Sequence, residues 1–346
     1  MLGRSSLSPW RDASAVQQVE KYRMNWKHKA AAFKLLGHVP FAHELHYFAQ
    51  RHITKKLPRS FPAISRYSAN FVAHLQAMQK HSSDPSLSSK TLFEFGAGWD
   101  LCSNIANYCF GINRQIVVDV RRLARSDAIN NVIRYYQGNG IIGATRRPAS
   151  LIVNPIEKDL EDKFGITYIA PQDAANTGLQ DESVDFVVST ATLEHIPPDD
   201  IRGIMLECNR LCKQNSILSL IIDYADHYAK SDKSINAFHF LRYDDREWKA
   251  YNPEWHYQNR LRHCDYLSLF DETGFEIVEE HGFVKDGDLD LVKQSPLAPR
   301  FREYNPEQLA VTSGRVVLRK KVPQRTRVPT MVPERSGDGA ARPGRT

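Results

Sequence analysis

A strand that carries an acidic residue and ends in a glycine turn lies near residue 95 of this 346-residue chain. Residues 92–100 read Leu-Phe-Glu-Phe-Gly-Ala-Gly-Trp-Asp, with Glu94 inside the apolar segment and Gly96 and Gly98 in the turn. A second apolar segment ends in Asp119, twenty-five residues after Glu94. Glycines let the backbone approach a ligand closely, and a carboxylate at the tip of the neighbouring strand accepts hydrogen bonds from ribose hydroxyls. The pattern therefore predicts a site for a ligand that contains a nucleoside.

Two details favour S-adenosylmethionine over a dinucleotide as that ligand. Dinucleotide sites place a third glycine three residues after the second, for tight packing of helix on strand, and this chain has Leu101 there. A dehydrogenase also needs a catalytic Tyr-x-x-x-Lys or a similar motif, which we do not find. Glu94 lies two residues before Gly96, where a carboxylate can face the amino group of a methionine moiety.

Three further motifs follow in order. A strand-like segment at 166–169 precedes Asp173, residues 183–187 read Ser-Val-Asp-Phe-Val, and residues 193–195 read Leu-Glu-His. With these motifs, residues 90–283 resemble the class I S-adenosylmethionine-dependent methyltransferases. The resemblance implies that Asp173 contacts the adenine amino group and that Glu194 belongs to the cofactor site. Trp99 and Asp100 depart from the small residues usual in the glycine loop, which leaves the contacts of this loop open.

The segment 223–263 is unusually rich in aromatic, histidine and arginine residues for a connection between a strand and a helix. Such side chains suit a polar, hydroxylated acceptor, and we expect Asp223, Tyr228 and Arg260 to bind it. The alternative is a lid whose aromatic rings pack on one another. The runs at 223–228 and 258–262 are similar to a bacterial branch of these methyltransferases associated with polysaccharide and glycolipid assembly.

A hydroxyl acceptor must lose its proton during methyl transfer, and histidine is the natural base near neutral pH. We predict that His195 or His227 is this base, although either residue is also compatible with a structural role. No recognisable metal triad is present, so the sequence predicts a metal-free reaction. The resulting hypothesis is methyl transfer to a small-molecule or glycan/glycolipid acceptor, on oxygen. The alternatives are an RNA methyltransferase and a non-catalytic S-adenosylmethionine-binding scaffold, although the intact Gly96, Gly98 and Asp119 disfavour the scaffold.

The elements that must position these residues alternate between strand and helix. This pattern predicts an α/β fold, a Rossmann-like, doubly wound, mostly parallel seven-stranded sheet with an N-terminal helical extension. Strands are expected near 91–95, 115–119, 166–170, 184–189, 216–222, 275–280 and 315–319. Helices are expected near 61–79, 100–109, 122–136, 199–213 and 263–273. Because Glu94, Asp119 and the other acids of the site fall at or near strand ends, they are expected to meet at one edge of the sheet.

Charge is distributed unevenly along the chain. Its net charge is +6, but residues 1–90 carry +10, residues 315–346 carry +7, and residues 91–314 carry −11. An acidic catalytic core is a poor surface for nucleic acid, so binding of nucleic acid is not expected. The basic helical pieces within 15–56 are expected to make weak contact with anionic membrane surfaces, although a solvated basic face is the simpler alternative.

Composition also divides the chain. Residues 1–14 and the basic tail 321–346 are expected to be disordered, residues 15–90 form the helical extension and linker, and residues 91–320 form the catalytic domain with its insertion at 223–263. No run of eighteen apolar residues and no apolar signal core occurs, which predicts a cytoplasmic protein, at most peripheral at the membrane. Five scattered cysteines are expected to be buried and reduced.

Overall fold

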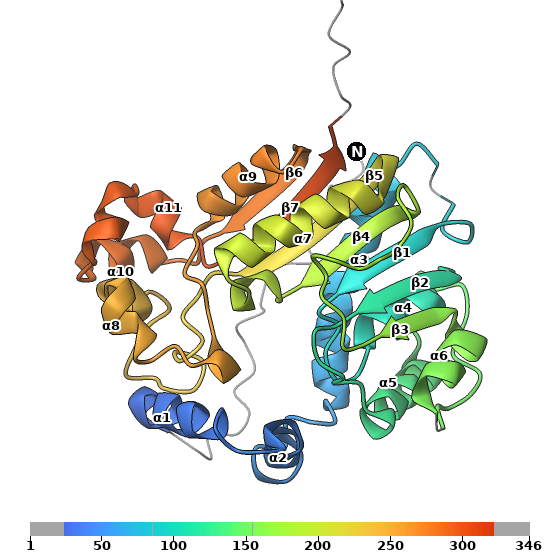
Figure 1. Ribbon diagram of the computed structural model, residues 1–346, viewed down its shortest axis with the longest axis horizontal. Helices are drawn as coiled ribbons and strands as arrows, with labels where there is room; N and C mark the ends of the chain where they lie inside the picture. Colours follow the sequence, from blue (N-terminus) through green and yellow to red (C-terminus); the bar gives the residue numbers. More distant parts are fainter. Residues whose placement is uncertain (1–23, 85, 154, 322–346) are drawn as a thin grey trace, which may run out of the picture.

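A seven-stranded sheet runs through the centre of the computed structural model, which describes residues 24–84, 86–153 and 155–321 (Figure 1). Its strand order is β3-β2-β1-β4-β5-β7-β6, and β7 alone runs antiparallel to its neighbours. The strands are β1 (Thr91–Phe95), β2 (Arg114–Val118), β3 (Ile166–Ile169), β4 (Val184–Thr190), β5 (Cys212–Asp223), β6 (Phe275–Phe283) and β7 (Ser313–Lys320). All seven strands expected from the sequence are present, and the Rossmann-like fold is confirmed.

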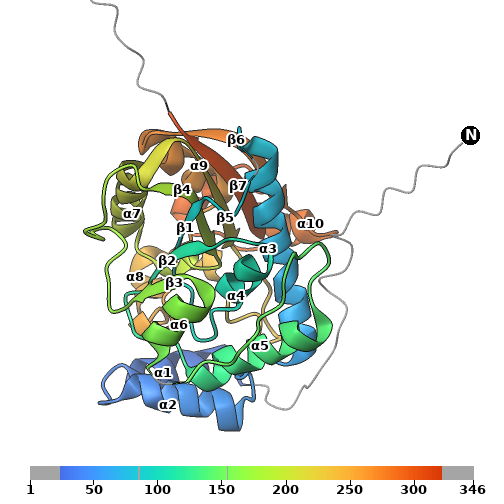
Figure 2. The same ribbon diagram turned by 90° about the vertical axis from the view of Figure 1, so that its right-hand side faces the viewer.

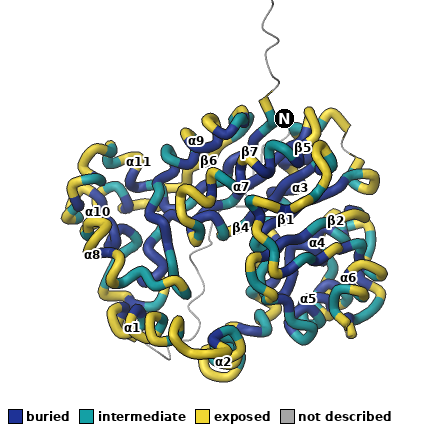
Figure 3. The backbone as a smooth tube through the Cα atoms, viewed as in Figure 1, coloured by how far each residue is buried: buried dark blue, intermediate teal, exposed yellow. Residues whose placement is uncertain are grey.

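The central strands are buried on both faces, as Figure 3 shows by their dark blue trace. Every residue of β1 is buried, and in the register Phe93 lies between Ile116 of β2 and Val187 of β4. Near-continuous apolar strands of this kind occur where helices cover both faces of a parallel sheet. The sheet is therefore the rigid core from which the loops of the site extend.

Helices cover the two faces in separate groups. Apolar residues of α3 (Phe61–His81), α4 (Cys102–Cys109), α5 (Ser126–Asn139) and α6 (Ile156–Phe164) pack together on one face. Residues of α7 (Pro198–Leu211) and α9 (His263–Glu272) pack on the other face. A further cluster joins the insertion after β5 to α1 (Trp26–Leu36) and to two short helices, α10 (Asp288–Gln294) and α11 (Pro306–Ala310).

The N-terminal helices lie on the side of the sheet where the parallel strands end, below it in both Figure 1 and Figure 2. Phe33 of α1 stacks on His256 of the insertion with ring centroids 4.8 Å apart. Tyr47 of α2 (Ala42–Phe48) stacks on Trp99, in the loop after β1, at 5.1 Å. A π-helical turn, η1 (Ala49–Ile53), extends α2. The extension thus bridges the glycine loop and the insertion.

The expected helices near 61–79, 100–109, 122–136, 199–213 and 263–273 are confirmed as α3, α4, α5, α7 and α9. Helix α6 and the short helices α8 (Asp245–Lys249), α10 and α11 were not predicted, because their few residues carry too short a periodic pattern. All five cysteines are free and four are buried, as expected, although Cys212 begins β5 instead of continuing the preceding helix.

Parts of the domain prediction fall on residues without a described structure. The tails expected to be disordered, 1–14 and 321–346, lie outside the described residues except for Lys321. Within the described ranges, none of the helices combines the length and the apolar content that crossing a bilayer requires.

Candidate active site

The order of the strands reverses between β1 and β4, because β2 and β3 lie on one side of β1 and the later strands lie on the other. Ligands of such sheets bind outside the carboxyl ends of the strands at this reversal. The loop after β1 and the loop after β4 meet there, where the Thr192 hydroxyl donates to the Gly96 carbonyl oxygen at 3.3 Å. Gly96 has a φ of +76°, and a Cβ there would overlap the Thr192 side chain. Only glycine lets the two loops approach this closely.

Asp119 follows β2 directly and faces the glycine loop. Its Oδ2 accepts a hydrogen bond from the Gly98 backbone N–H at 3.3 Å, and its Oδ1 accepts one from the Arg121 N–H at 3.1 Å. Each carboxylate oxygen has a further lone pair, so two ribose hydroxyls can still be accepted. Gly98 has a φ of +74°, and a Cβ there would meet no heavy atom within 4 Å, so open space adjoins the loop beside Asp119. Burial raises the pKa of Asp119 above its ordinary value.

Glu94 is buried within β1, and its carboxylate accepts hydrogen bonds from side chains of α4, the helix that follows. The Ser103 hydroxyl donates to the two carboxylate oxygens at 2.6 and 2.8 Å, and the Asn104 amide donates to one of them at 2.9 Å. Burial raises the pKa of Glu94 to about 7, although the bonds from Ser103 and Asn104 oppose this. Glu94 therefore fixes the start of α4 against β1, and the contact predicted with a methionine amino group stays a prediction.

The two unusual residues of the glycine loop have structural partners. Asp100 is 1% exposed, and its carboxylate pairs with Arg59 at 2.6 Å and accepts the Cys102 N–H at 3.3 Å, which holds the first turn of α4. Trp99 stacks on Tyr47 of the N-terminal extension. These residues connect the loop to the segment before the catalytic domain, which explains why the loop departs from the family pattern.

Asp173 lies in the turn after β3 and is exposed. Its Oδ1 accepts the backbone N–H of Ala175 at 2.8 Å, and the neighbouring Gln172 N–H donates to the Asp119 carbonyl oxygen at 2.9 Å. The structure thus brings Asp119 and Asp173 to the same edge of the sheet, as the predicted ribose and adenine contacts require.

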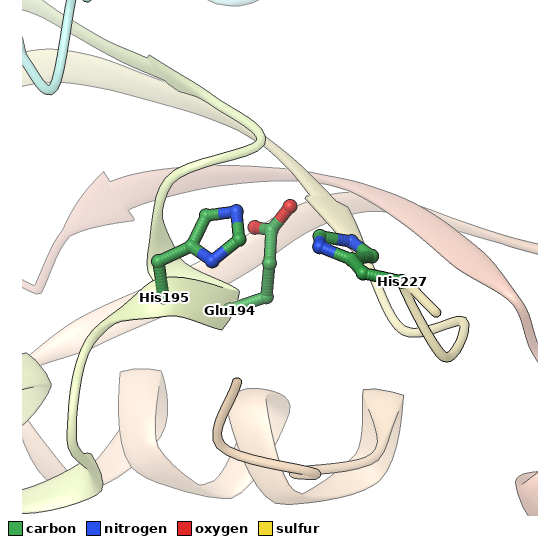
Figure 4. A group of neighbouring side chains, drawn as sticks. All are labelled: Glu194, His195 and His227. Atoms are coloured by element: carbon green, nitrogen blue, oxygen red, sulfur yellow. The ribbon is translucent and has the colours of Figure 1, made fainter. Parts of the chain in front are cut away.

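Three predicted residues converge beyond the ends of β4 and β5 (Figure 4). Glu194 lies beside the rings of His195 and His227, whose centroids are 4.9 Å apart. Glu194 and His195 belong to a 3-10 turn, η2 (Leu193–His195), whereas His227 follows β5. The Glu194 side chain is buried, and burial raises its pKa to about 8. The structure brings Glu194 next to both candidate bases, and its predicted place in the cofactor site stays a prediction.

The two histidines differ in their surroundings. His195 Nδ1 lies 2.8 Å from the Tyr257 carbonyl oxygen, so Nδ1 carries the proton and Nε2 keeps its lone pair. Part of the His195 ring is open to solvent, yet the atoms packed around it remove much of its hydration, and His227 opposes a second positive charge. Both effects lower the pKa of His195. Burial also lowers the pKa of His227, although Asp223, 3.4 Å from its Nε2, opposes this.

The predicted acceptor residues are engaged by the protein itself. Asp223 pairs with Lys230 at 2.6 Å, and although burial acts in the opposite direction, His227 and Lys230 hold the pKa of Asp223 below its usual range. The buried Tyr228 hydroxyl donates to the Tyr251 carbonyl oxygen at 2.6 Å. The Arg260 guanidinium, 3% exposed, donates to backbone carbonyls of the insertion, including that of Phe240 at 2.8 Å. Tyr228 and Arg260 thus stabilise the insertion, as the alternative of a packed lid predicts, and acceptor contacts from them stay predictions.

Asn259 is a supporting residue that the sequence analysis missed. Its backbone N–H donates to the Glu194 carbonyl oxygen at 2.9 Å, and its side-chain amide donates to the carbonyls of Leu193 and Ile196, both at 2.8 Å. These bonds clamp the turn that carries Glu194 and His195. The only signal in the sequence was the position of Asn259 in a polar run, because bonds from a side chain to a distant backbone leave no periodic pattern.

A family model and several solved structures are similar to this chain. Residues 152–220 match a family model described as a methyltransferase domain, and no curated protein matches the chain. Among solved structures, the PH0226 protein of Pyrococcus horikoshii OT3 is 12% identical, with a TM-score of 0.45, over 80% of this chain and 99% of that one.

Two other similar structures have named activities. Geranyl diphosphate C-methyltransferase of Streptomyces coelicolor A3(2) is 11% identical, with a TM-score of 0.43, over 72% of this chain and 80% of that one. The [4+2]-cyclase SpnF is 11% identical, with a TM-score of 0.43, over 74% and 83%. At these values, none of the structures indicates what this chain binds or modifies. Over residues 152–220, the chain is similar to a methyltransferase domain.

Proposed function

We propose that this chain, which carries a methyltransferase domain that uses S-adenosylmethionine, transfers a methyl group to a hydroxyl of a small-molecule or glycan/glycolipid acceptor. The observation that carries the proposal is the meeting of two loops at the reversal of strand order. One loop carries Gly98 beside Asp119, and the other carries His195, and Thr192 joins them through Gly96. When bound, the cofactor supplies a methyl carbon activated by the adjacent sulfonium.

The residues present fit this cofactor. Asp119 has free lone pairs for the ribose hydroxyls, and Gly98 leaves open space beside it. Asp173 would accept the adenine amino group, and the loop from Gly96 would run beside the methionine moiety. Glu94 supports that loop from beneath through Ser103.

His195 would remove the proton of the acceptor hydroxyl. Its Nδ1–H is committed to the Tyr257 carbonyl oxygen, so Nε2 is the acceptor atom. Because the surroundings lower its pKa, the ring is neutral at pH 7 and ready to take a proton. The Asn259 clamp on the turn restricts the position of the ring, which favours a fixed alignment of base and acceptor.

The acidic balance of residues 91–314 supports a glycan or small-molecule acceptor over nucleic acid. A purified protein given a cofactor with a radiolabelled methyl group and a cell extract tests the acceptor class. Label in the glycolipid or small-molecule fraction supports the proposal, and label confined to RNA contradicts it.

Binding of the cofactor depends on Asp119. Replacing Asp119 by alanine removes two charge-assisted hydrogen bonds and is expected to weaken binding of S-adenosylmethionine by about 1.5–3 kcal/mol, or about 10- to 150-fold. Titration calorimetry measures this, with Asp286→Ala, at an exposed turn, as the matched control. Binding of NAD without binding of S-adenosylmethionine would overturn the cofactor assignment.

The N-terminal extension presents an apolar and basic surface that we propose contacts anionic membranes. Its exposed large apolar side chains include Leu35, Val39, Phe41, Leu45, Phe48 and Ile53. Lys34, Lys55 and Lys56 are exposed in the same segment. Apolar insertion together with attraction to anionic lipids is the combination that holds an interfacial helix on a bilayer.

Vesicle flotation tests this contact. The protein is expected to float with vesicles that contain phosphatidylserine and less with vesicles of phosphatidylcholine alone. The double replacement Phe41→Ser with Phe48→Ser should lower the bound fraction at least about fivefold, because each phenylalanine contributes on the order of 1.5–3 kcal/mol when buried. Ile142→Ser, at a residue 99% exposed outside this segment, is the control. If the protein floats with neither kind of vesicle, the membrane contact is contradicted and the basic face is solvated.

A further inference from the structure

The Glu194 carboxylate is buried without a partner. The residue is 2% exposed, and neither of its side-chain oxygens has a hydrogen-bond partner among the described residues. A buried polar group without a partner costs free energy, and more so when it is charged. Asn259 holds the backbone of this turn in place, and no group in the described part of the protein satisfies the Glu194 side chain. Such an arrangement indicates that a ligand completes it.

The groups that face Glu194 are suited to a cation. One ring nitrogen of His195, one of His227 and one Glu194 oxygen all lie within 4.8 Å of one another. Figure 4 shows the carboxylate of Glu194 next to both rings. Ligands of a single ion lie about 3–4 Å apart, given bonds of about 2.0–2.2 Å, so small side-chain rotations close the site. His195 is exposed enough to make that rotation.

The protonation of His195 already matches that of a metal ligand. Histidines that bind a metal donate their other N–H to a carbonyl or carboxylate, which fixes the tautomer and the orientation of the ring. His195 Nδ1 makes such a bond to the Tyr257 carbonyl oxygen at 2.8 Å. Nε2 is therefore available for the metal.

The local charge also favours a cation. Two carboxylates, of Glu194 and Asp223, and one ammonium, of Lys230, lie around the histidines, with Lys230 2.6 Å from Asp223. Lys230 is paired with Asp223 and leaves Glu194 without a cationic partner. A divalent ion would stabilise the ionised form of Glu194, which no ammonium or guanidinium of the described residues contacts.

We propose that Glu194, His195 and His227 bind a divalent transition-metal ion through one carboxylate and two imidazoles. Two imidazoles and a carboxylate suit ions such as Zn²⁺, Co²⁺ or Fe²⁺, whereas Mg²⁺ prefers oxygen ligands alone. Three protein ligands leave positions open for a water or an acceptor oxygen. The sequence predicted no metal, because these ligands lie on two separate loops with no recognisable ligand spacing.

The role of the ion rests on the proposed function. An acceptor hydroxyl bound at an open position would lose its proton more easily, because the cation stabilises the oxygen anion. The proton passes to water, the oxygen forms a bond to the methyl carbon, and the carbon–sulfur bond breaks with its electron pair going to sulfur. His195 Nε2 would then be a ligand and not the base itself.

Metal binding is measured on the full chain after chelation and dialysis. Calorimetry with Zn²⁺ and the visible absorption of added Co²⁺ should both report one ion per chain. Glu194→Gln, which keeps the shape of the side chain, and His227→Ala should each weaken binding at least about tenfold. His281→Ala, at an exposed histidine on β6, should leave it unchanged. No stoichiometric binding, or equal binding by wild type and Glu194→Gln, would overturn the proposal.

Calorimetry with S-adenosylhomocysteine on the same samples separates this proposal from the proposed function. Binding of S-adenosylhomocysteine without binding of Co²⁺ or Zn²⁺ overturns the metal site and leaves the methyltransferase intact. Binding of metal without S-adenosylhomocysteine supports the site while the proposed function fails. Thermal unfolding by circular dichroism checks that each variant is folded, and a wild-type spectrum of bound Co²⁺ keeps the proposal testable if a variant is not.

Discussion

Replacing His195 by alanine is expected to lower the rate of methyl transfer by about 10²–10⁴. The replacement removes the group that handles the acceptor proton, either directly as a base or as a ligand of the ion that activates the acceptor. The affinity of the variant for S-adenosylmethionine should stay near that of wild type, because the proposed cofactor contacts come from Asp119 and the loop after β1. Initial rates with labelled cofactor, together with calorimetry, measure the two quantities.

The matched control is His38→Ala, at an exposed histidine at the end of α1, which should react at the wild-type rate. A wild-type rate for His195→Ala would make His195 a packing residue and transfer the role of base to His227. If neither histidine matters, the acceptor is one that needs no base, such as an already ionised or nitrogenous group.

The two roles of His195 predict different effects of a chelator and of added imidazole on turnover. As a free base, His195 should leave wild-type turnover insensitive to a chelator, and added imidazole should partly restore His195→Ala. As a metal ligand, it should make turnover sensitive to the chelator and recoverable with Zn²⁺ or Co²⁺. The Nε2 atom has one lone pair, so a single turnover cannot use it in both ways.

The sequence predicted the sheet and its acidic edge because both are local. The strands of the parallel sheet contain short apolar runs, such as Ile116–Val118 in β2, and Asp119 follows this run directly, so chain position and spatial position agree. The prediction of a glycine turn after β1 is also confirmed, because Gly96 and Gly98 both adopt positive φ. Periodicity and turn chemistry contain this information without any tertiary contact.

The sequence could not predict those features of the site that depend on long-range contacts. The residues near Trp99 in the sequence do not indicate that it stacks on Tyr47. Those near Asp100 do not indicate that it forms an ion pair with Arg59. Arg260 was predicted to bind the acceptor because a guanidinium in an aromatic segment suits a sugar. The sequence did not indicate that backbone carbonyls of the insertion accept hydrogen bonds from it. Partners of this kind follow from the path of loops across the surface, which local propensity does not determine.

The grouping of Glu194 with His227 was hidden for the same reason. The resemblance of the Leu-Glu-His motif to class I methyltransferases placed Glu194 in the cofactor site. His227, which lies close to it, follows a different strand. Only the order β1-β4-β5 brings the two ends together. A missing partner is also invisible in a sequence, because satisfaction of a buried carboxylate is a property of the folded packing.

Glu94 is expected to make the free energy of unfolding fall as pH rises from 4.5 to 7. Burial raises its pKa from 4.5 to about 7, so between these values the folded protein holds a proton that the unfolded chain has released. Stability decreases with pH wherever the folded state binds more protons. The loss is about 3 kcal/mol at about 1.4 kcal/mol per pKa unit, complete near pH 7 and flat above it.

Comparing urea unfolding of wild type and Glu94→Gln at several pH values isolates this contribution. Other groups have slopes of their own, and His74, whose pKa burial lowers to about 3, acts in the opposite direction below pH 6.5. The difference between the two proteins removes such contributions, because the amide that replaces the Glu94 carboxylate cannot titrate. The variant should therefore gain on wild type by about 3 kcal/mol between pH 4.5 and 7. The exposed Glu276→Gln should show no such gain, and parallel profiles for wild type and Glu94→Gln would mean that Glu94 is ionised throughout and that Ser103 and Asn104 outweigh its burial.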